Sequence, residues 1–376
     1  MDRADIKNDG GDKVMEKARI SSLQLFLLIT GFLFGSTLIL NPATGAKNDG
    51  WMAILIGGAV GTLLLAVYAS IALLNPSKTL VEILRDRFGK VIGNIIAILY
   101  IWYFIHLASL VFRNFGSFML TTTYPKTPLE VIIAVFALVV MYAVNSGVEV
   151  IGRASEILVP FVPVIVVIIS LGILTVHDFT AFLPVLENGI SPVIKASLNL
   201  LTFPFGETIV FLMIFPHLNK RENLKKVSTL SALSATGLFL FIFFRDITVL
   251  GSHLIYQATF VPHLTSVLIP GINLEPLFNV NLIIGGSIKV VICMYAAVNG
   301  LNQLIGANDY RKFTTAVATF CVVLSIWVYE NIFEMFDWAE NIWLYYSIPF
   351  QIVIPLMLLF LSLIKKGNPA HEKSIE

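Results

Sequence analysis

The residues with the clearest chemical potential lie in the segment 202–208 (TFPFGET), inside a long apolar run. A charged side chain at the centre of a bilayer costs at least about 2.5 kcal/mol, so Glu207 should have a functional reason to be there. Pro204 and Gly206 interrupt the helix beside it, and the backbone groups they free are tolerated in lipid only next to a cavity. The segment therefore predicts a binding site at membrane depth.

A second segment repeats this pattern near the start of the chain. Residues 34–40 (FGSTLIL) and 205–211 (FGETIVF) both read Phe-Gly-x-Thr followed by three apolar residues, at an offset of 171. An interrupted helix leaves the amides of a half-helix pointing into the cavity with partial positive charge. A small anion such as an amino-acid carboxylate can bind there without an arginine.

The side chains around the two interruptions offer a mixed lining for such a ligand. Gly35 removes a side chain so that a ligand can approach the backbone, and Glu207 can accept from a ligand ammonium or carry a proton. The candidate binding residues in the two segments are Phe34, Gly35, Ser36, Thr37, Thr202, Phe203, Phe205, Gly206 and Glu207.

Composition places these segments in an integral membrane protein. The chain of 376 residues is 57% hydrophobic and 13% charged, with a mean hydropathy of +0.84, whereas soluble domains carry roughly 25% charged residues. The net charge of +1 gives no indication of nucleic-acid binding. Cys293 and Cys321 lie in apolar runs without metal-ligand spacing, and we expect no metal and no cofactor.

Ten apolar runs are long enough to cross a membrane, at about 20 residues each. The first is too long for a signal peptide and lacks a small-residue cleavage site. The expected spans are 21–46, 51–74, 92–119, 129–145, 157–176, 193–217, 228–249, 277–305, 313–329 and 343–364. Between them, residues 76–88 read as a short amphipathic surface helix, and residues 252–276 as an outer segment broken by prolines.

Loop charge predicts the orientation of these spans. With the N-terminus inside, 19 of the 25 basic residues fall on the cytoplasmic side and five outside, while Lys289 lies within a span. This asymmetry is a strong positive-inside signal. Both termini are therefore expected in the cytoplasm.

The spans divide into two halves of five helices that enter the membrane from opposite sides. Glycine-interrupted helices at corresponding positions of inverted halves are the best sequence pointer to a transporter binding site. The predicted organisation is an all-α integral membrane protein with a 5+5 inverted repeat and broken helices 1 and 6. Its expected parts are a cytoplasmic tail 1–19, one transmembrane domain 20–366 with repeats 21–176 and 193–365, and a second tail 367–376.

This organisation resembles the LeuT-like amino acid–polyamine–organocation superfamily. More narrowly, the chain resembles the spore germination permease family, the B subunits of spore germinant receptors. The segments that carry the resemblance are 35–42 (GSTLILNP), 203–216 (FPFGETIVFLMIFP) and 295–311 (YAAVNGLNQLIGANDYR).

The resemblance implies a subunit that senses an amino-acid-type germinant in the spore inner membrane, beside an A subunit and a lipoprotein C subunit. It also implies that the third and eighth helices line the pocket, which adds Tyr103 and Tyr295 as candidates. In related transporters the eighth helix helps to form a sodium site. Lys289 could then replace a coupling sodium ion, exchanging a proton or pairing with Glu207, or it could be a fixed structural anchor.

Two functions share all these residues. One is a ligand-sensing receptor subunit, in which a ligand at the broken helices shifts an open–closed equilibrium that partner subunits read. The other is a proton-coupled amino acid permease that uses Glu207 or Lys289. An enzyme is not expected, because the sequence has no HExxH, no GxSxG and no paired membrane aspartates.

Overall fold

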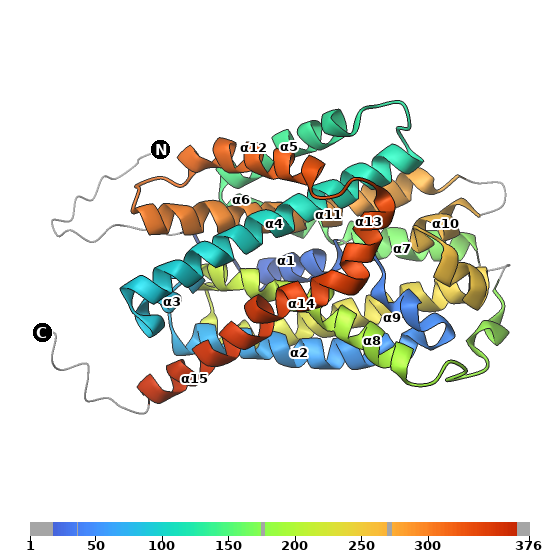
Figure 1. Ribbon diagram of the computed structural model, residues 1–376, viewed down its shortest axis with the longest axis horizontal. Coiled ribbons are helices and arrows are strands. Elements are labelled where there is room, and N and C mark those ends of the chain that lie inside the picture. Colours follow the sequence, from blue (N-terminus) through green and yellow to red (C-terminus); the bar gives the residue numbers. More distant parts are fainter. Residues whose placement is uncertain (1–17, 36, 174–176, 269–272, 367–376) are drawn as a thin grey trace, which may run out of the picture.

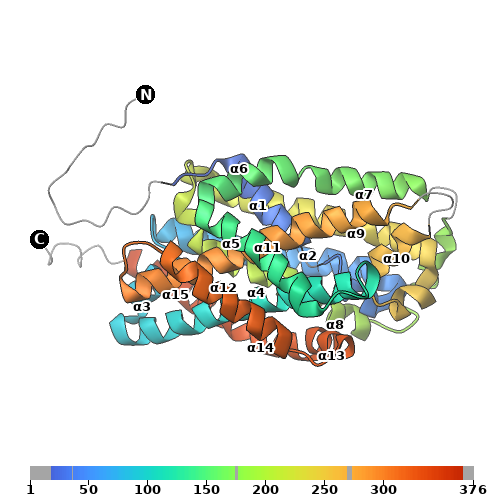
Figure 2. The same ribbon diagram turned by 90° about the horizontal axis from the view of Figure 1, so that it is seen from above.

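The described part of the computed structural model, residues 18–35, 37–173, 177–268 and 273–366, is built from helices and contains no strand. The longer helices run along the long axis of the molecule, with α3 and α15 toward one end and α10 toward the other (Figures 1 and 2). The α-helices are α1 (Ser22–Phe34), α2 (Gly50–Leu74), α3 (Leu80–Phe88), α4 (Lys90–Thr122), α5 (Leu129–Ser146), α6 (Val148–Leu158), α7 (Phe161–Gly172), α8 (Ser191–Leu200), α9 (Leu224–Gln257), α10 (Val261–Val267), α11 (Glu275–Ile305), α12 (Arg311–Trp327), α13 (Ile332–Asp337), α14 (Trp343–Ile348) and α15 (Ile354–Lys366).

Within the described residues, eight helical segments are long and apolar enough to cross a membrane. The other two expected spans, 21–46 and 313–329, contain shorter helices: α1 has 13 residues and α12 has 17. The first span is short because its helix ends at Phe34 and residues 37–46 are not α-helical. All ten expected positions therefore hold a helix, but only eight meet the length of a full span.

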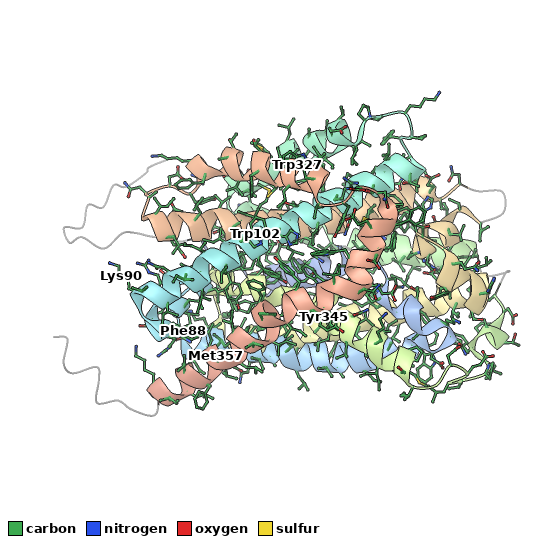
Figure 3. All side chains as sticks on the ribbon, viewed as in Figure 1. Phe88, Lys90, Trp102, Trp327, Tyr345 and Met357 are labelled. Carbon is green, nitrogen blue, oxygen red and sulfur yellow. The ribbon has the colours of Figure 1, made fainter. Side chains whose placement is uncertain are left out.

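The surface of the helices matches a lipid environment. Large apolar side chains such as Trp327, Tyr345 and Met357 are exposed, and they lie on the outer helices in Figure 3. Burying such residues is the rule in water-soluble proteins, whereas a lipid-facing surface keeps them outside.

The expected amphipathic helix at 76–88 is confirmed as α3. The Thr79 side chain accepts from the backbone amide of Glu82, whose own side chain accepts from the amide of Thr79. This reciprocal capping starts the helix at Leu80. Leu80, Ile83 and Leu84 are buried on one face, which seats α3 against α4 and the end of α15.

The fifth expected span contains a kink near its start. α6 ends at Leu158 and α7 begins at Phe161, with Pro160 between them. Proline cannot donate the backbone hydrogen bond that would continue the helix. An apolar groove of about 450 Å³ lies beside this break, between α1, α7 and α9, with Phe34 and Pro163 among its lining residues.

The start of the described chain is tied to the end of the sixth span. The Ile20 amide donates to the His217 carbonyl at 2.8 Å, and the Asn219 amide donates to the Ile20 carbonyl at 3.0 Å. His217 Nδ1 lies 3.2 Å from the Ala18 carbonyl oxygen. These contacts close one end of the helix bundle around the broken sixth helix.

Candidate functional site

The first interruption follows α1. The Gly35 amide still donates to the Phe32 carbonyl at 3.3 Å, but residues 38–40 are not α-helical and Pro42 begins a 3-10 segment. The Thr37 hydroxyl donates to the Phe34 carbonyl at 2.9 Å, which satisfies an acceptor freed at the helix end. The predicted break of the first helix is confirmed; Ser36 lies outside the described residues.

A contact with α11 explains why the break carries glycine. A Cβ on Gly35 would lie 2.8 Å from the carbonyl carbon of Gly285 and 3.2 Å from Cβ of Lys289. A Cβ on Gly285 would lie 2.8 Å from Cα of Gly35. The space that we expected to admit a ligand at Gly35 is therefore occupied by the backbone of α11.

The second interruption follows α8. Residues Leu201–Phe205 form a π-helical turn in which Phe203 is extended, with φ −136° and ψ 109°. A 3-10 segment, Gly206–Met213, then continues the span. The predicted break of the sixth helix is confirmed.

Side chains from other helices satisfy the carbonyls that this break frees. The Thr202 carbonyl accepts from Gln351 Nε2 at 2.9 Å and from Trp343 Nε1 at 3.3 Å. The Tyr68 hydroxyl lies between the carbonyl oxygens of Gly206 and Gln351, at 3.1 Å and 2.6 Å, and its one proton is shared between these two acceptors. An open carbonyl in lipid would cost several kcal/mol without such partners.

Gln351 lies against the break in a single orientation. Its Nε2 also donates to the Tyr103 hydroxyl at 2.8 Å, and the Thr202 carbonyl can only accept, so Nε2 must face these two groups. Oε1 then faces Gly206, where a Cβ would overlap it. Oε1 is buried and has no hydrogen-bond donor among the described residues.

Glu207 and Lys289 meet between the two breaks. Both side chains are fully buried and form an ion pair. Lys289 Nζ also lies 4.5 Å from the ring centroid of Phe203 and 5.3 Å from that of Phe32. Apart from the ion pair, the carboxylate and the ammonium have no hydrogen bond to the described residues.

The remaining candidates are placed at different distances from this pair. Tyr103 reaches the break through Gln351, and its ring stacks on Phe350 with centroids 4.8 Å apart. Tyr295 lies six residues after Lys289 on α11, about 9 Å along the axis. Its hydroxyl is 3.4 Å from His217 Nε2, so it belongs to the end of the sixth span rather than to its centre.

The aromatic and small residues of the two segments have packing partners. Phe205 packs against Gly61 and forms an edge contact with Phe239, with centroids 6.2 Å apart. The Thr202 hydroxyl donates back to the carbonyls of its own helix.

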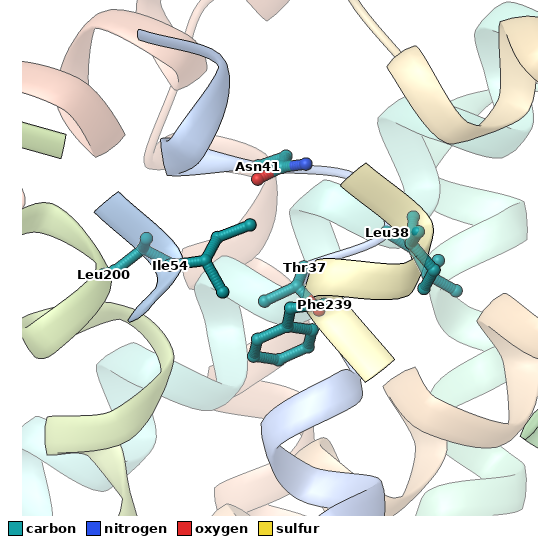
Figure 4. A pocket seen from close by; sticks show the side chains of 7 residues that line it. Thr37, Leu38, Asn41, Ile54, Leu200 and Phe239 are labelled. Carbon is teal, nitrogen blue, oxygen red and sulfur yellow. The ribbon is translucent and has the colours of Figure 1, made fainter. Parts of the chain in front are cut away.

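A pocket lies beside the non-helical stretch of the first span (Figure 4). Its accessible volume is about 10 Å³, which is about the space that one water molecule needs. A ligand of amino-acid size would require this region to open. The lining residues are Thr37, Leu38, Asn41, Ile54, Leu200, Phe239 and Ile242.

Sequence reasoning missed Gln351, Tyr68, Trp343 and Gly285. Gln351 had a signal, because it is a polar residue inside the last expected span. Tyr68 and Trp343 carried no such signal in the sequence, because an aromatic residue in an apolar run is usual in a membrane helix. No group of three or more His, Cys, Asp or Glu residues that could hold a metal occurs in the part of the chain that the structure covers.

The two interrupted helices, packed with α11 around the buried ion pair of Glu207 and Lys289, are those of a LeuT-like transporter fold. The fold of the nucleobase–cation symport transporter Mhp1, in a closed conformation with bromovinylhydantoin bound, matches at a TM-score of 0.69 and 12% identity, covering 91% of this chain and 78% of that one. The structure of MhsT in complex with L-phenylalanine matches at 0.68 and 14% identity, covering 93% and 99%.

The sequence places the chain in one family within this fold. The family model described as spore germination protein matches residues 19–334. Spore germination protein KB of Bacillus subtilis is 34% identical over 96% of this chain and 99% of its own length. Spore germination protein B2 of the same organism is 23% identical over 93% and 96%.

The chain therefore belongs to the spore germination protein family, as a membrane protein of the germinant receptor B type. The expected resemblance to the spore germination permeases is confirmed. The family and the fold are those of receptors and transporters.

Proposed function

We propose that this chain is the germinant-sensing subunit of a spore germinant receptor and binds a small amino-acid-type ligand at its two interrupted helices. The observation that carries the proposal is the meeting of both breaks at one buried charge pair, Glu207 and Lys289. Such pairs are costly in a membrane and are retained mainly at binding or coupling sites. The fold shared with MhsT, whose structure holds L-phenylalanine, supports the ligand class.

Ligand binding would act by changing the conformation of the chain. The pocket beside the first break holds about 10 Å³, so the described conformation has no room for the ligand there. A ligand that binds an open form better shifts the population toward it. The groups that we assign to first contact are Thr37, Phe203 and Glu207.

An A subunit and a lipoprotein C subunit in the spore inner membrane would respond to this change of conformation. We propose that both termini lie in the cytoplasm, and that residues 20–366 form one domain of two repeats, 21–176 and 193–365. The basic residues around α3 support this orientation, because cytoplasmic loops collect lysine and arginine.

The experiment uses spores that lack this chain and are complemented with variants. Glu207→Gln should abolish the fall in optical density that amino acids trigger, because the variant cannot hold a cation. Glu340→Gln, which removes the exposed pair with Lys195, should keep the response. Protein levels are checked by immunoblot. A full response from Glu207→Gln spores would remove this site from the proposal.

A second candidate function is a proton-coupled amino acid permease, which the buried pair also favours. Vesicles containing the chain alone separate the two. Uptake of labelled amino acid driven by a proton gradient would indicate a permease. Absence of uptake, with a germination response that requires the two partner subunits, would indicate a receptor.

A further inference from the structure

The groups around Lys289 Nζ form a cation-binding cage. The cage consists of the Glu207 carboxylate and the rings of Phe203 and Phe32, whose centroids lie 4.5 Å and 5.3 Å from the ammonium. An aromatic face within about 6 Å attracts a cation, more so when water is excluded. A carboxylate supplies the countercharge and accepts the N–H hydrogen bonds.

The cage is filled by the chain itself. Lys289 is fully buried, and its Cβ lies beside Gly35, so the stem of the side chain runs from the first break toward the second. The ammonium forms no hydrogen bond to the described residues beyond its contact with Glu207. Another primary ammonium can therefore take its place beside Glu207 without leaving the carboxylate of the cage unpaired.

We propose that this cage is the binding site for the ammonium group of the external ligand, and that Lys289 occupies it as a tethered competitor in the ligand-free state. The inference rests on the proposed function, in which the ligand binds at the interrupted helices. It adds the ligand chemistry, a primary ammonium compound, and the event that binding requires, the departure of Lys289 Nζ from Glu207.

Two ammonium groups cannot share one buried carboxylate, because like charges at that depth repel strongly. The ligand therefore enters only as Lys289 leaves. The Cβ of Lys289 lies at the contact between α1 and α11, so displacement of its side chain changes the packing of these two helices. Ligand binding would therefore affect the rest of the helix bundle through the contact between α1 and α11.

The test makes room in the cage and supplies a free ammonium. Lys289→Ala removes three methylene groups and the ammonium, which together have the size of propylammonium. We expect millimolar propylamine at pH 7 to raise the melting temperature of detergent-purified Lys289→Ala protein by several degrees. Propanol, which lacks the charge, should leave it unchanged.

Three controls locate the effect. Propylammonium should not stabilise the wild type, whose cage is full, or Lys289→Met, whose side chain fills the space. It should lose its effect in the double variant Lys289→Ala with Glu207→Gln. Equal stabilisation in any of these proteins, or no shift in folded Lys289→Ala, would overturn the proposal.

The variant could fail to fold, and a second measurement covers that case. Expression of Lys289→Ala in medium with propylamine should restore the yield of monodisperse protein at least several-fold, and propanol should not. Equal yields with both compounds would reject the cage.

The result of the propylammonium test can be distinguished from the result of the germination test of the proposed function. Loss of germination in Glu207→Gln without any propylammonium effect would retain the ligand site and reject the tethered competitor. Stabilisation by propylammonium with normal germination in Glu207→Gln would retain the cage and reject its role in sensing.

Discussion

At the scale of single residues, the buried pair of Glu207 and Lys289 carries the largest energetic consequence. Both side chains are fully buried, so removing one leaves an uncompensated charge. Breaking a buried pair in this way costs about 3–5 kcal/mol, whereas replacing both partners by apolar groups is often neutral. The pair thus adds little net stability relative to an apolar pair of similar size, although breaking it is costly.

The burial of both charges predicts a matched set of stabilities. Lys289→Met and Glu207→Leu should each lower the melting temperature strongly, and the double variant should recover most of the loss. Lys195→Met, which breaks a pair with side chains 53% and 60% exposed, should cost about 1 kcal/mol or less. Thermal unfolding in one detergent measures all four. A double variant less stable than both single variants would contradict the account.

The sequence allowed Glu207 and Lys289 to be found because a charge inside an apolar run is costly wherever the chain places it. Their contact was one of several open interpretations, since nothing local links positions 82 residues apart. Gln351 could not be assigned to the site in the same way. Its role depends on the Thr202 carbonyl and the Tyr103 hydroxyl, which become its partners only when the last helix packs across the break.

At the scale of elements, the contact of α1 with α11 sets the geometry of the site. Gly35 and Gly285 bring the two backbones together, and this approach positions Lys289 beside the first break. The ten helical segments and both breaks could be predicted from hydropathy, proline and glycine. The role of Gly285 on α11 could not be predicted, because apolar runs commonly contain glycine and the sequence does not show which surface packs against it.

Two neighbouring glycines test this contact directly. Gly285→Ala would place a Cβ 2.8 Å from Cα of Gly35, while a Cβ on Gly286 would meet nothing within 4 Å. Alanine favours a helix by about 1 kcal/mol over glycine. We therefore expect Gly286→Ala to be neutral or stabilising and Gly285→Ala to lower the yield and melting temperature. Equal behaviour of the two variants would refute the close approach.

At the scale of the whole molecule, ionic contacts at one end join segments distant in sequence. Asp86 on α3 contacts Lys78 at 3.0 Å and Lys365 of α15 at 3.3 Å. Partial burial opposes ionisation of Asp86, but the hydrogen bonds and charges of the two lysines outweigh it and lower its pKa. The last membrane helix is thereby held to the surface helix that follows the second span.

The lowered pKa has a defined effect on stability. A carboxyl group with a depressed folded-state pKa stabilises the fold above its unfolded value of about 4, and this contribution is lost as the pH falls through the folded value. The melting temperature of the wild type should therefore fall more between pH 6 and pH 3 than that of Asp86→Asn. Because Asp86 is partly exposed, the difference should shrink in high salt. Parallel pH profiles of the two proteins would remove Asp86 from this role.

The proposed orientation predicts which positions a membrane-impermeant maleimide can reach. The natural cysteines, Cys293 and Cys321, are buried, so we expect them not to react with the maleimide. Lys126→Cys should be labelled on intact cells or protoplasts, and Lys90→Cys only after the membrane is permeabilised. Both positions are exposed, so the reversed pattern would invert the topology.

The meeting of Gly35 and Gly285 also has an evolutionary consequence. Each glycine leaves the volume that the other's backbone fills, so a single replacement at either position meets an obstacle that no rotamer change relieves. Descendants of this sequence could change the two positions only together with a displacement of a whole helix. The pair should consequently drift more slowly than the side chains around it, whose chemistry could change while the contact of α1 with α11 is kept.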